Sequence, residues 1–362
     1  MKTNTDLFEK VPVPKAVATM AVPTMISMLV VVIYNMADTF FIGQTQDPLQ
    51  VAAVSLATPV FMIFMALGNL FGIGGSSAIS RALGKDRAWH ISSFCCYGAL
   101  GLGVIVAVCS VLGMEGILGL IGASENTIGF ARKYLLIISI GAPTILFSTA
   151  FANILRGEGA ARESMVGNLL GTIINIVLDP VMILMLGWGV TGAALATIIG
   201  NIAACLFYLQ YFLRKKSTLS ISWKYFKVGE GIAKSVVAIG IPASLNNILM
   251  SFANIILNQA LVGYGDTPVA AMGVALKSNM LVVLLQIGLC VGIQPLIGYN
   301  YGAGNKKRLM QVVTNFINNA LKFTSEGQIL LEYHPVEGTG QIEFSVTDTG
   351  MGIAPDAVVT VF

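Results

Sequence analysis

The chain has 362 residues, of which 55% are hydrophobic and 11% are charged. Soluble domains carry roughly 25% charged residues, so this composition excludes an ordinary soluble enzyme and indicates a protein with many membrane-spanning helices. The net charge of +3 is too small to indicate nucleic-acid binding.

Eight apolar stretches are long enough to cross a bilayer as helices, which takes about 20 residues each. They lie at Ala16–Ile42, Val51–Ile79, His90–Leu112, Tyr134–Leu155, Met165–Leu186, Val190–Leu213, Val236–Val262 and Val269–Tyr299. We therefore predict an all-α polytopic membrane protein. The first span is too long for a cleavable signal peptide, so we expect it to direct membrane insertion itself.

Basic residues are concentrated in every second loop. Clusters of Lys and Arg follow the second, fourth, sixth and eighth spans, whereas the loops at 44–50, 187–189 and 263–268 contain none. Only Arg132 and Lys133, at the edge of the fourth span, blur this pattern. The positive-inside rule places the N-terminus, the even-numbered loops and the C-terminal tail in the cytoplasm. We expect a multi-pass protein of a bacterial inner (plasma) membrane.

The sequence repeats itself at an offset of about 220 residues, which chance would rarely produce. Residues 21–25 resemble 240–244, residues 51–54 resemble 269–272, and residues 72–85 resemble 292–305. Six helices separate the copies, so both copies have the same orientation, as in transporters built from two parallel lobes. The predicted divisions are a cytoplasmic N-terminal segment (1–15), a six-helix first lobe (16–213), a cytoplasmic loop (214–235), a second lobe cut short after two helices (236–305) and a tail (306–362).

Two acidic side chains lie inside predicted spans, Asp38 in the first and Asp179 in the fifth. An ionisable residue inside a membrane helix costs about 2.5–3.5 kcal/mol, so each is a candidate functional residue. Asn175 precedes Asp179 by four residues and shares its helix face, while Pro180 weakens the backbone hydrogen bonding beside the carboxylate. These oxygens suit a hard cation, and two neighbouring carboxylates raise each other's pKa, so either Na⁺ or H⁺ could be bound. The structural alternative is that both acids cap or pair within the bundle.

Three motifs in the chain resemble those of the multidrug and toxic compound extrusion (MATE) transporters, over about residues 11–308. They are Asn-Met-Ala-Asp-Thr-Phe-Phe-Ile-Gly at 35–43, Asn-Ile-Val-Leu-Asp-Pro at 175–180 and Gly-Tyr-Asn-Tyr-Gly-Ala-Gly-Asn at 298–305. The resemblance implies a secondary antiporter, not an enzyme, that exports cationic or amphipathic small molecules in exchange for H⁺ or Na⁺ without a further cofactor. The family's cation site carries over to Asp38, Asn175, Asp179 and Thr197.

Three further polar residues are weaker candidates for a substrate cavity. Lys277 lies in the eighth span near its outer end, where its side chain could instead extend to the membrane surface. Asn247 and Asn254 belong to a polar stripe on the seventh span together with Asn246 and Asn258. Hydrogen bonding between helices explains this stripe equally well.

After Arg308 the pattern changes to that of a small α/β fold. Residues 311–323 predict an amphipathic helix, and residues 328–334 and 341–348 predict two strands. The stretch 308–362 resembles the ATP-binding domain of sensor histidine kinases, through an N box at 315–324 and a glycine box at 348–353.

That second resemblance implies roles for six residues. Asn319 would hold Mg²⁺, Asn315 and Lys322 would lie near the phosphates, Asp348 would accept a hydrogen bond from the adenine amino group, and Gly350 and Gly352 would let the backbone approach the nucleotide. No ATP lid follows the glycine box, and neither histidine heads a dimerisation helix. We therefore expect neither ATP binding nor kinase activity from this partial domain.

Two functional hypotheses follow. The first is an efflux antiporter that is inactive or impaired because its second lobe is joined, near residues 305–313, to a fragment of another family, which makes the chain a chimera. The alternative is a membrane-bound signalling protein, similar to a sensor histidine kinase, with a multi-span sensor and an incomplete ATP-binding domain. The missing phospho-acceptor and lid count against the second hypothesis.

Overall fold

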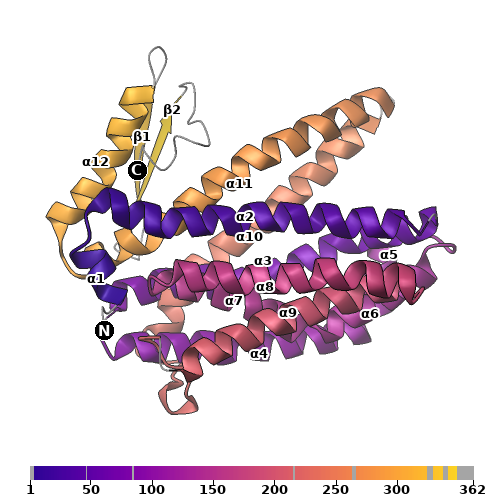
Figure 1. The fold of residues 1–362 in the computed structure, drawn as a ribbon, viewed down its shortest axis with the longest axis horizontal. Coiled ribbons are helices and arrows are strands. Elements are labelled where there is room, and N and C mark those ends of the chain that lie inside the picture. The colour runs from indigo at the N-terminus through magenta and orange to yellow at the C-terminus, as the bar shows by residue number, and fades with distance from the viewer. Residues whose placement is uncertain are drawn as a thin grey trace.

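The computed structural model describes residues 4–45, 47–83, 85–214, 217–262, 266–323, 329–336 and 341–348. These residues form a bundle of long helices followed by one helix and a two-stranded sheet (Figure 1). The helical and strand elements are α1 (Asn4–Glu9), α2 (Val13–Gly43), α3 (Pro48–Ala82), α4 (Arg87–Leu112), α5 (Met114–Leu120), α6 (Ile128–Ile140), α7 (Ala142–Gly157), α8 (Ala161–Asp179), a π-helical segment η1 (Pro180–Met185), α9 (Val190–Leu213), a 3₁₀ turn η2 (Trp223–Tyr225), α10 (Ile232–Val262), α11 (Asp266–Gly302), α12 (Lys306–Phe323), β1 (Ile329–Val336) and β2 (Gln341–Asp348).

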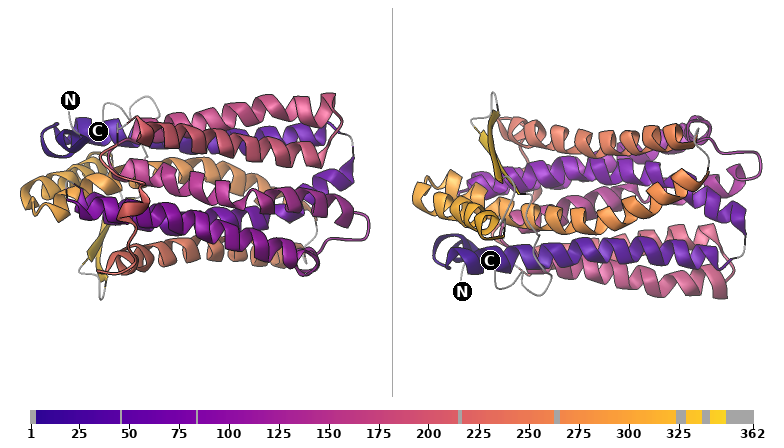
Figure 2. Two further views of the ribbon diagram at one scale, coloured as in Figure 1. Left: turned by 90° about the horizontal axis from the view of Figure 1, so that it is seen from below. Right: turned by 90° about the horizontal axis from the view of Figure 1, so that it is seen from above.

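The long helices run roughly along one axis of the molecule (Figures 1 and 2). Within the described residues, five helices are long and apolar enough to cross a membrane, or six when the bent pair α6 and α7 is counted as one span. Their outer faces carry large apolar side chains, such as Ile105 on α4 and Val177 on α8, which are each 59% exposed. Such faces are suited to contact with lipid chains, which confirms the prediction of a polytopic membrane protein.

The predicted fourth span, Tyr134–Leu155, is wrong as a single continuous helix. The chain forms α6 and α7, which meet at Gly141 and are bent by 56°. Pro143 in the first turn of α7 has no N–H group and therefore cannot continue the hydrogen bonding of α6. A Cβ atom at Gly141 would lie 2.0 Å from Cδ1 of Ile198, so the bend also brings this turn against α9.

The first lobe is held together by two apolar clusters. One lies toward the N-terminal end of the bundle and includes the stacked rings of Phe147 and Phe151, whose centroids are 4.2 Å apart. The other lies on the opposite half and includes Phe64, Leu135 and Ile183. In this lobe α3 packs against α7, α4 against α7, and α8 against both α2 and α9.

The second pair of long helices packs onto the first pair through glycines. α10 lies against α3, and α11 lies against α2 and α3. A Cβ atom at Gly240 would lie 2.0 Å from the carbonyl oxygen of Leu70, and one at Gly292 would lie 2.6 Å from Cα of Ala21. The backbones therefore approach so closely that no side chain fits between them, as is common between membrane helices.

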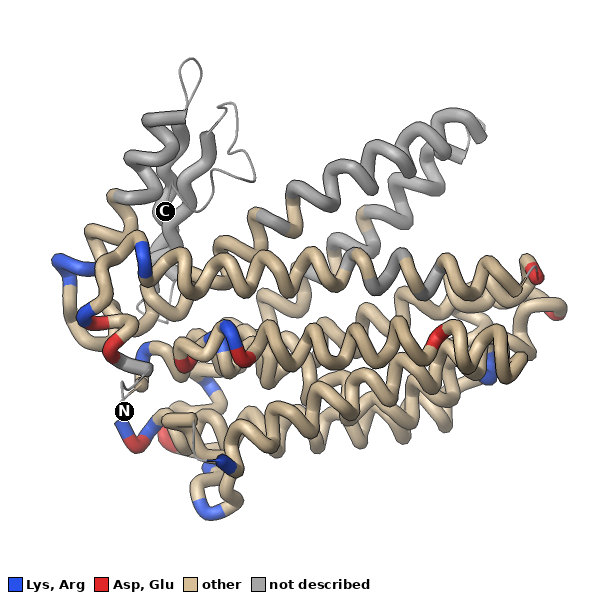
Figure 3. Tube along the Cα trace, in the orientation of Figure 1, with Lys and Arg blue, Asp and Glu red and all other residues tan. Residues whose placement is uncertain are grey.

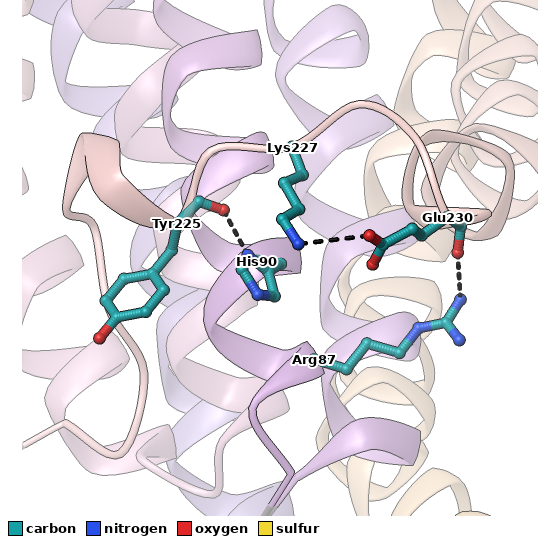
Figure 4. Close-up of polar contacts among 5 residues, drawn as sticks. All are labelled: Arg87, His90, Tyr225, Lys227 and Glu230. Carbon is teal, nitrogen blue, oxygen red and sulfur yellow. Dashed lines mark hydrogen bonds and ion pairs between the residues drawn. The ribbon is translucent and has the colours of Figure 1, made fainter.

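The segment that joins α9 to α10 is fastened to the first half of α4 instead of crossing free space. Trp89 donates from Nε1 to the carbonyl of Thr218 at 2.8 Å, and His90 Nδ1 lies 2.7 Å from the carbonyl oxygen of Tyr225. Further along, Arg87 donates to the carbonyl oxygen of Glu230 at 3.3 Å (Figure 4). The connection is thus attached, between Thr218 and Glu230, to the start of α4 at one end of the first lobe.

The predicted helix and two strands of the tail are present, although the helix begins earlier than expected, at Lys306. β1 and β2 pair antiparallel, with Ile329 opposite Asp348 and Val336 opposite Gln341. The start of α12 is attached to the N-terminal segment, because Arg308 donates to the carbonyl oxygens of Leu7 and Val11.

Charged residues are unevenly distributed along the bundle. Most Lys and Arg residues lie at the end that holds the N-terminus, and the opposite end carries few (Figure 3). The basic loops alternate with uncharged loops in the sequence, and alternate loops of such a bundle lie at the same end, so the basic residues are concentrated there.

Candidate functional site

The candidate site is centred on the end of α8, where the helix changes geometry. α8 ends at Asp179, and the next six residues, beginning with Pro180, form the π-helical segment η1. Proline cannot donate to the carbonyl four residues earlier, so the regular α-helical ladder is interrupted beside the carboxylate. Asp179 is fully buried and Asn175 is 2% exposed, so both lie inside the bundle.

Thr197 of α9 completes a cluster of three polar side chains. Asn175 donates from Nδ2 to Oγ1 of Thr197 at 3.5 Å, and Thr197 is 2% exposed. The two helices come together because glycines face each other at this level, and a Cβ atom at Gly171 would lie 2.7 Å from the carbonyl oxygen of Gly200. The structure therefore brings Asn175 and Thr197 together in a region closed to solvent, and buries Asp179 about one helical turn after Asn175.

The polar cluster extends further than sequence reasoning anticipated. Asn201 donates from Nδ2 to the carbonyl oxygen of Thr197 at 2.9 Å and accepts at Oδ1 from the hydroxyl of Ser148 at 2.7 Å. Asn201 follows Thr197 by four residues, so the same helical spacing that links Asn175 with Asp179 could have revealed it. Ser148 comes from α7 and has no comparable signal in the sequence.

For most of the remaining predicted residues, the structure describes the backbone but not the side chain. Asp38 lies on α2, which packs along α8, but its side chain falls outside the described part of the structure. The same holds for the side chains of the other candidates that lie on described helices and strands. These are Asn247, Asn254, Lys277, Asn315, Asn319, Lys322 and Asp348. Gly350 and Gly352 lie outside the described residues altogether.

Chemically, the cluster offers one carboxylate with amide and hydroxyl groups. Oxygen ligands of this kind suit a hard cation, and a carboxyl group can also carry a proton. An arrangement with one acid and neutral partners can therefore exchange a small cation without a permanent countercharge.

Comparison with known families divides the chain into two parts. Residues 23–181 and 242–321 match the MatE family. Residues 304–362 match the family described as histidine kinase-, DNA gyrase B- and HSP90-like ATPase. The two matches overlap at 304–321, a stretch that begins two residues before α12 and includes most of that helix.

Relatives and solved structures agree with the first of these matches. The chain is 39% identical to the multidrug export protein MepA of Staphylococcus saprophyticus over 309 residues, which are 84% of this chain and 68% of that protein. It is 38% identical to MepA of Staphylococcus aureus (strain NCTC 8325 / PS 47), with the same coverage.

Among solved structures, a MATE protein in the straight conformation has a TM-score of 0.82 and 31% identity, covering 89% of this chain and 72% of that one. A MOP superfamily transporter from Pyrococcus furiosus has a TM-score of 0.81 and 31% identity, with the same coverage of both chains. With this sequence match and this arrangement of helices, the chain belongs to the MatE family of multidrug efflux transporters.

Proposed function

We propose that the chain is a secondary antiporter that exports cationic or amphipathic compounds in exchange for H⁺ or Na⁺. The relatives most similar over the transporter part are named as multidrug export proteins. The observation that carries the proposal is the complete burial of Asp179 one helical turn after Asn175, whose amide donates to Thr197. A buried acid is costly in a membrane protein and is retained where it serves a task such as ion binding.

The proposed ion-coupling residues are Asp38, Asn175, Asp179 and Thr197. Asp179 would hold the proton or Na⁺, while the amide of Asn175 and the hydroxyl of Thr197 supply neutral oxygens and orient the carboxylate. Asp38 would add a second carboxylate from α2, the helix that packs along α8. The interrupted helix at Pro180 supports this assignment, because π-helical segments are frequent at functional sites.

Replacement of the central acid tests this proposal. In proteoliposomes we expect Asp179→Asn to abolish substrate export driven by a proton or sodium gradient, because the amide can neither take up and release a proton nor supply a negative charge to balance Na⁺. The matched control is Glu115→Gln, which removes an exposed acid that is paired with Arg132. Gradient-driven export by Asp179→Asn at the wild-type rate would refute the coupling role.

We further propose that this polypeptide transports weakly as it stands. The second lobe contributes two long helices, and sequence of another family begins at 304. If so, the rate of gradient-driven export by this chain will be far below that of the MepA relatives measured under the same conditions.

The second candidate function is signalling, and the match of residues 304–362 to an ATPase family is the observation that favours it. In that case the helical bundle would sense a signal and the tail would act on nucleotide. Incubation of the full chain with radiolabelled ATP separates the two candidates. Transfer of label to the chain supports signalling, whereas gradient-driven export that depends on Asp179 supports transport.

A further inference from the structure

A groove of about 210 Å³ lies between α8 and α9 at the end of the bundle where basic residues gather. Its walls include Arg162 near the start of α8 and Arg214 just after the end of α9. Phe207, Gln210 and Tyr211 line it from the α9 side. The groove is about 20 Å or more from the buried acid, judging by the 17 residues that separate Arg162 from Asp179 at about 1.5 Å per residue.

The groove forms because α8 and α9 are in contact near the middle of α8 and are separated by a side chain one turn closer to its start. They meet at Gly171 and Gly200, where only glycine allows the contact. One turn closer to the basic end, the ring of Tyr208 stands against Gly167, and its hydroxyl donates to Oδ1 of Asn168 at 2.9 Å. Tyr208 therefore acts as a fixed spacer between the helices, and the space beyond it remains open.

The two arginine side chains of this groove have no ion-pairing partner among the residues that the structure describes. Arg162 and Arg214 are both exposed, and neither guanidinium group forms an ion pair or hydrogen bond with any residue that the structure describes. Glu163 also lines the groove and opposes the two arginines in sign, but it pairs with neither of them. Lys215 and Lys216 follow Arg214 in the sequence and add to the positive charge of this stretch.

The groove continues into an apolar surface suited to hydrocarbon. Val166 lines the groove itself, and the exposed side chains Leu170, Ile173 and Val177 follow it along α8 at spacings of four, three and four residues. Leu206 is exposed on α9 at 61%. An occupant that fits both parts carries an anionic group at one end and a long apolar chain at the other.

We propose that this groove binds one anionic phospholipid, with its phosphodiester between Arg162 and Arg214 and an acyl chain along the exposed face of α8. The guanidinium fork matches phosphate oxygens in two-point hydrogen bonding, which lysine does not provide. Basic pockets between membrane helices are suited to such head groups. The lipid would fix the start of α8, the helix that also carries Asn175 and Asp179.

The first test measures lipid binding to the full chain purified in a neutral detergent. Phosphatidylglycerol, phosphatidylcholine and inorganic phosphate are titrated separately, and bound lipid is counted by native mass spectrometry. We expect one retained phosphatidylglycerol and no retained phosphatidylcholine at the same concentration. Equal retention of both lipids would overturn the proposal, and so would competition by millimolar inorganic phosphate, since the recognised species would then be a free anion.

Variants test the two arginines. Arg162→Gln combined with Arg214→Gln should weaken phosphatidylglycerol binding by about tenfold or more, since both charged hydrogen-bond donors to the phosphodiester are lost. Lys224→Gln combined with Lys234→Gln removes the same charge from exposed positions outside the groove and should leave binding unchanged. Equal loss in both double variants would show nonspecific attraction and overturn the site.

A variant that is expected to strengthen lipid binding separates loss of the site from loss of folding. Glu163→Gln removes the one acidic side chain in the described lining of the groove, so it should strengthen phosphatidylglycerol binding. A misfolded protein would not bind more tightly. If Glu163→Gln weakens binding or leaves it unchanged while the arginine variants lose it, the head group does not lie in this groove.

Discussion

At the scale of single residues, Glu158 is the acid that sequence reasoning passed over. It caps the end of α7, is fully buried, and accepts hydrogen bonds at Oε2 from the hydroxyl of Ser217 at 2.6 Å and the backbone N–H of Thr218 at 3.1 Å. Tyr211 also hydrogen-bonds to it. Burial raises the pKa of this carboxyl to about 7, although these hydrogen bonds pull the pKa back toward its usual value. Arg156, two residues earlier, forms no ion pair with it.

This pKa predicts how stability depends on pH. Because the folded-state pKa lies above the unfolded value of 4.5, Glu158 should favour the folded state fully below pH 4.5, and this contribution should be lost as the pH rises through about 7. The expected loss is about 2–4 kcal/mol, since one pKa unit corresponds to about 1.4 kcal/mol. Thermal unfolding of the detergent-solubilised chain at pH 5 and pH 8 measures it.

Glu158→Gln keeps an acceptor for Ser217 and Thr218 but cannot ionise, so its melting temperature should change less between the two pH values. Glu125→Gln, which alters an exposed acid, is the control and should retain the wild-type dependence. If Glu158→Gln keeps the full slope, the pH response belongs to another group.

Some residues of the candidate site can be predicted from the local sequence pattern, and others cannot. Asn175 and Asp179 could be predicted because both lie on one helix four residues apart, within an apolar run where polar groups are conspicuous. Ser148 could not, because its partner Asn201 lies 53 residues away and the pairing depends on how α7 packs against α9. Glu158 likewise depends on partners about 60 residues away, which no local pattern reveals.

At the scale of helices, close backbone contacts between α3 and α10 set a strict size limit. Gly240 lies against Leu70, and a Cβ atom at this position would be 2.0 Å from a backbone oxygen that cannot move away on its own. We expect Gly240→Ala to force the helices apart and to destabilise the protein by about 1–3 kcal/mol.

The control for this substitution is Gly101→Ala on α4. A Cβ atom at Gly101 meets nothing within 4 Å, and alanine favours a helix over glycine by about 1 kcal/mol. Melting temperatures of the two variants in the same detergent should therefore move in opposite directions. A Gly240→Ala protein as stable as the wild type would mean that α10 and α3 do not pack this closely.

All eight predicted spans fall on helices, the fourth on the bent pair α6 and α7, because a long window of apolar residues is a strong signal. The bend between α6 and α7 was missed for the same reason. Hydrophobicity does not change at Gly141 and Pro143, so a count of apolar residues passes over them. The short helix α5 was missed because seven residues are too few to stand out as a periodic pattern.

At the scale of the whole molecule, the distribution of charge predicts orientation. The basic end should face the cytoplasm, and the opposite end should face outward. Lys85 lies just before the start of α4, whereas Glu125 lies between α5 and α6, beyond the other end of α4. In intact cells, a membrane-impermeant maleimide should therefore label Glu125→Cys but should label Lys85→Cys only after lysis. Both substitutions belong in a background in which the exposed Cys109 and Cys290 are replaced by serine.

The reverse labelling pattern would invert the assigned topology. Labelling of both positions in intact cells would indicate leakage, and labelling of an internal cytoplasmic protein in the same sample detects this.

The repeat in the sequence predicted two lobes of equal orientation. It could not predict where the lobes touch, because those contacts depend on glycines whose partners lie on other helices.

The connection between the lobes has a mechanical consequence. Its backbone is hydrogen-bonded to the start of α4 as far as Glu230, through the side chains of Trp89, His90 and Arg87. This length of chain is therefore not free to move relative to α4. Glu230 and Gly231 are consecutive residues with positive φ, at 57° and 72°, directly before α10 begins. If the lobes change their angle during transport, the backbone rotation would occur at these two hinge residues. α10 would then rotate about its first residue instead of sliding along the first lobe.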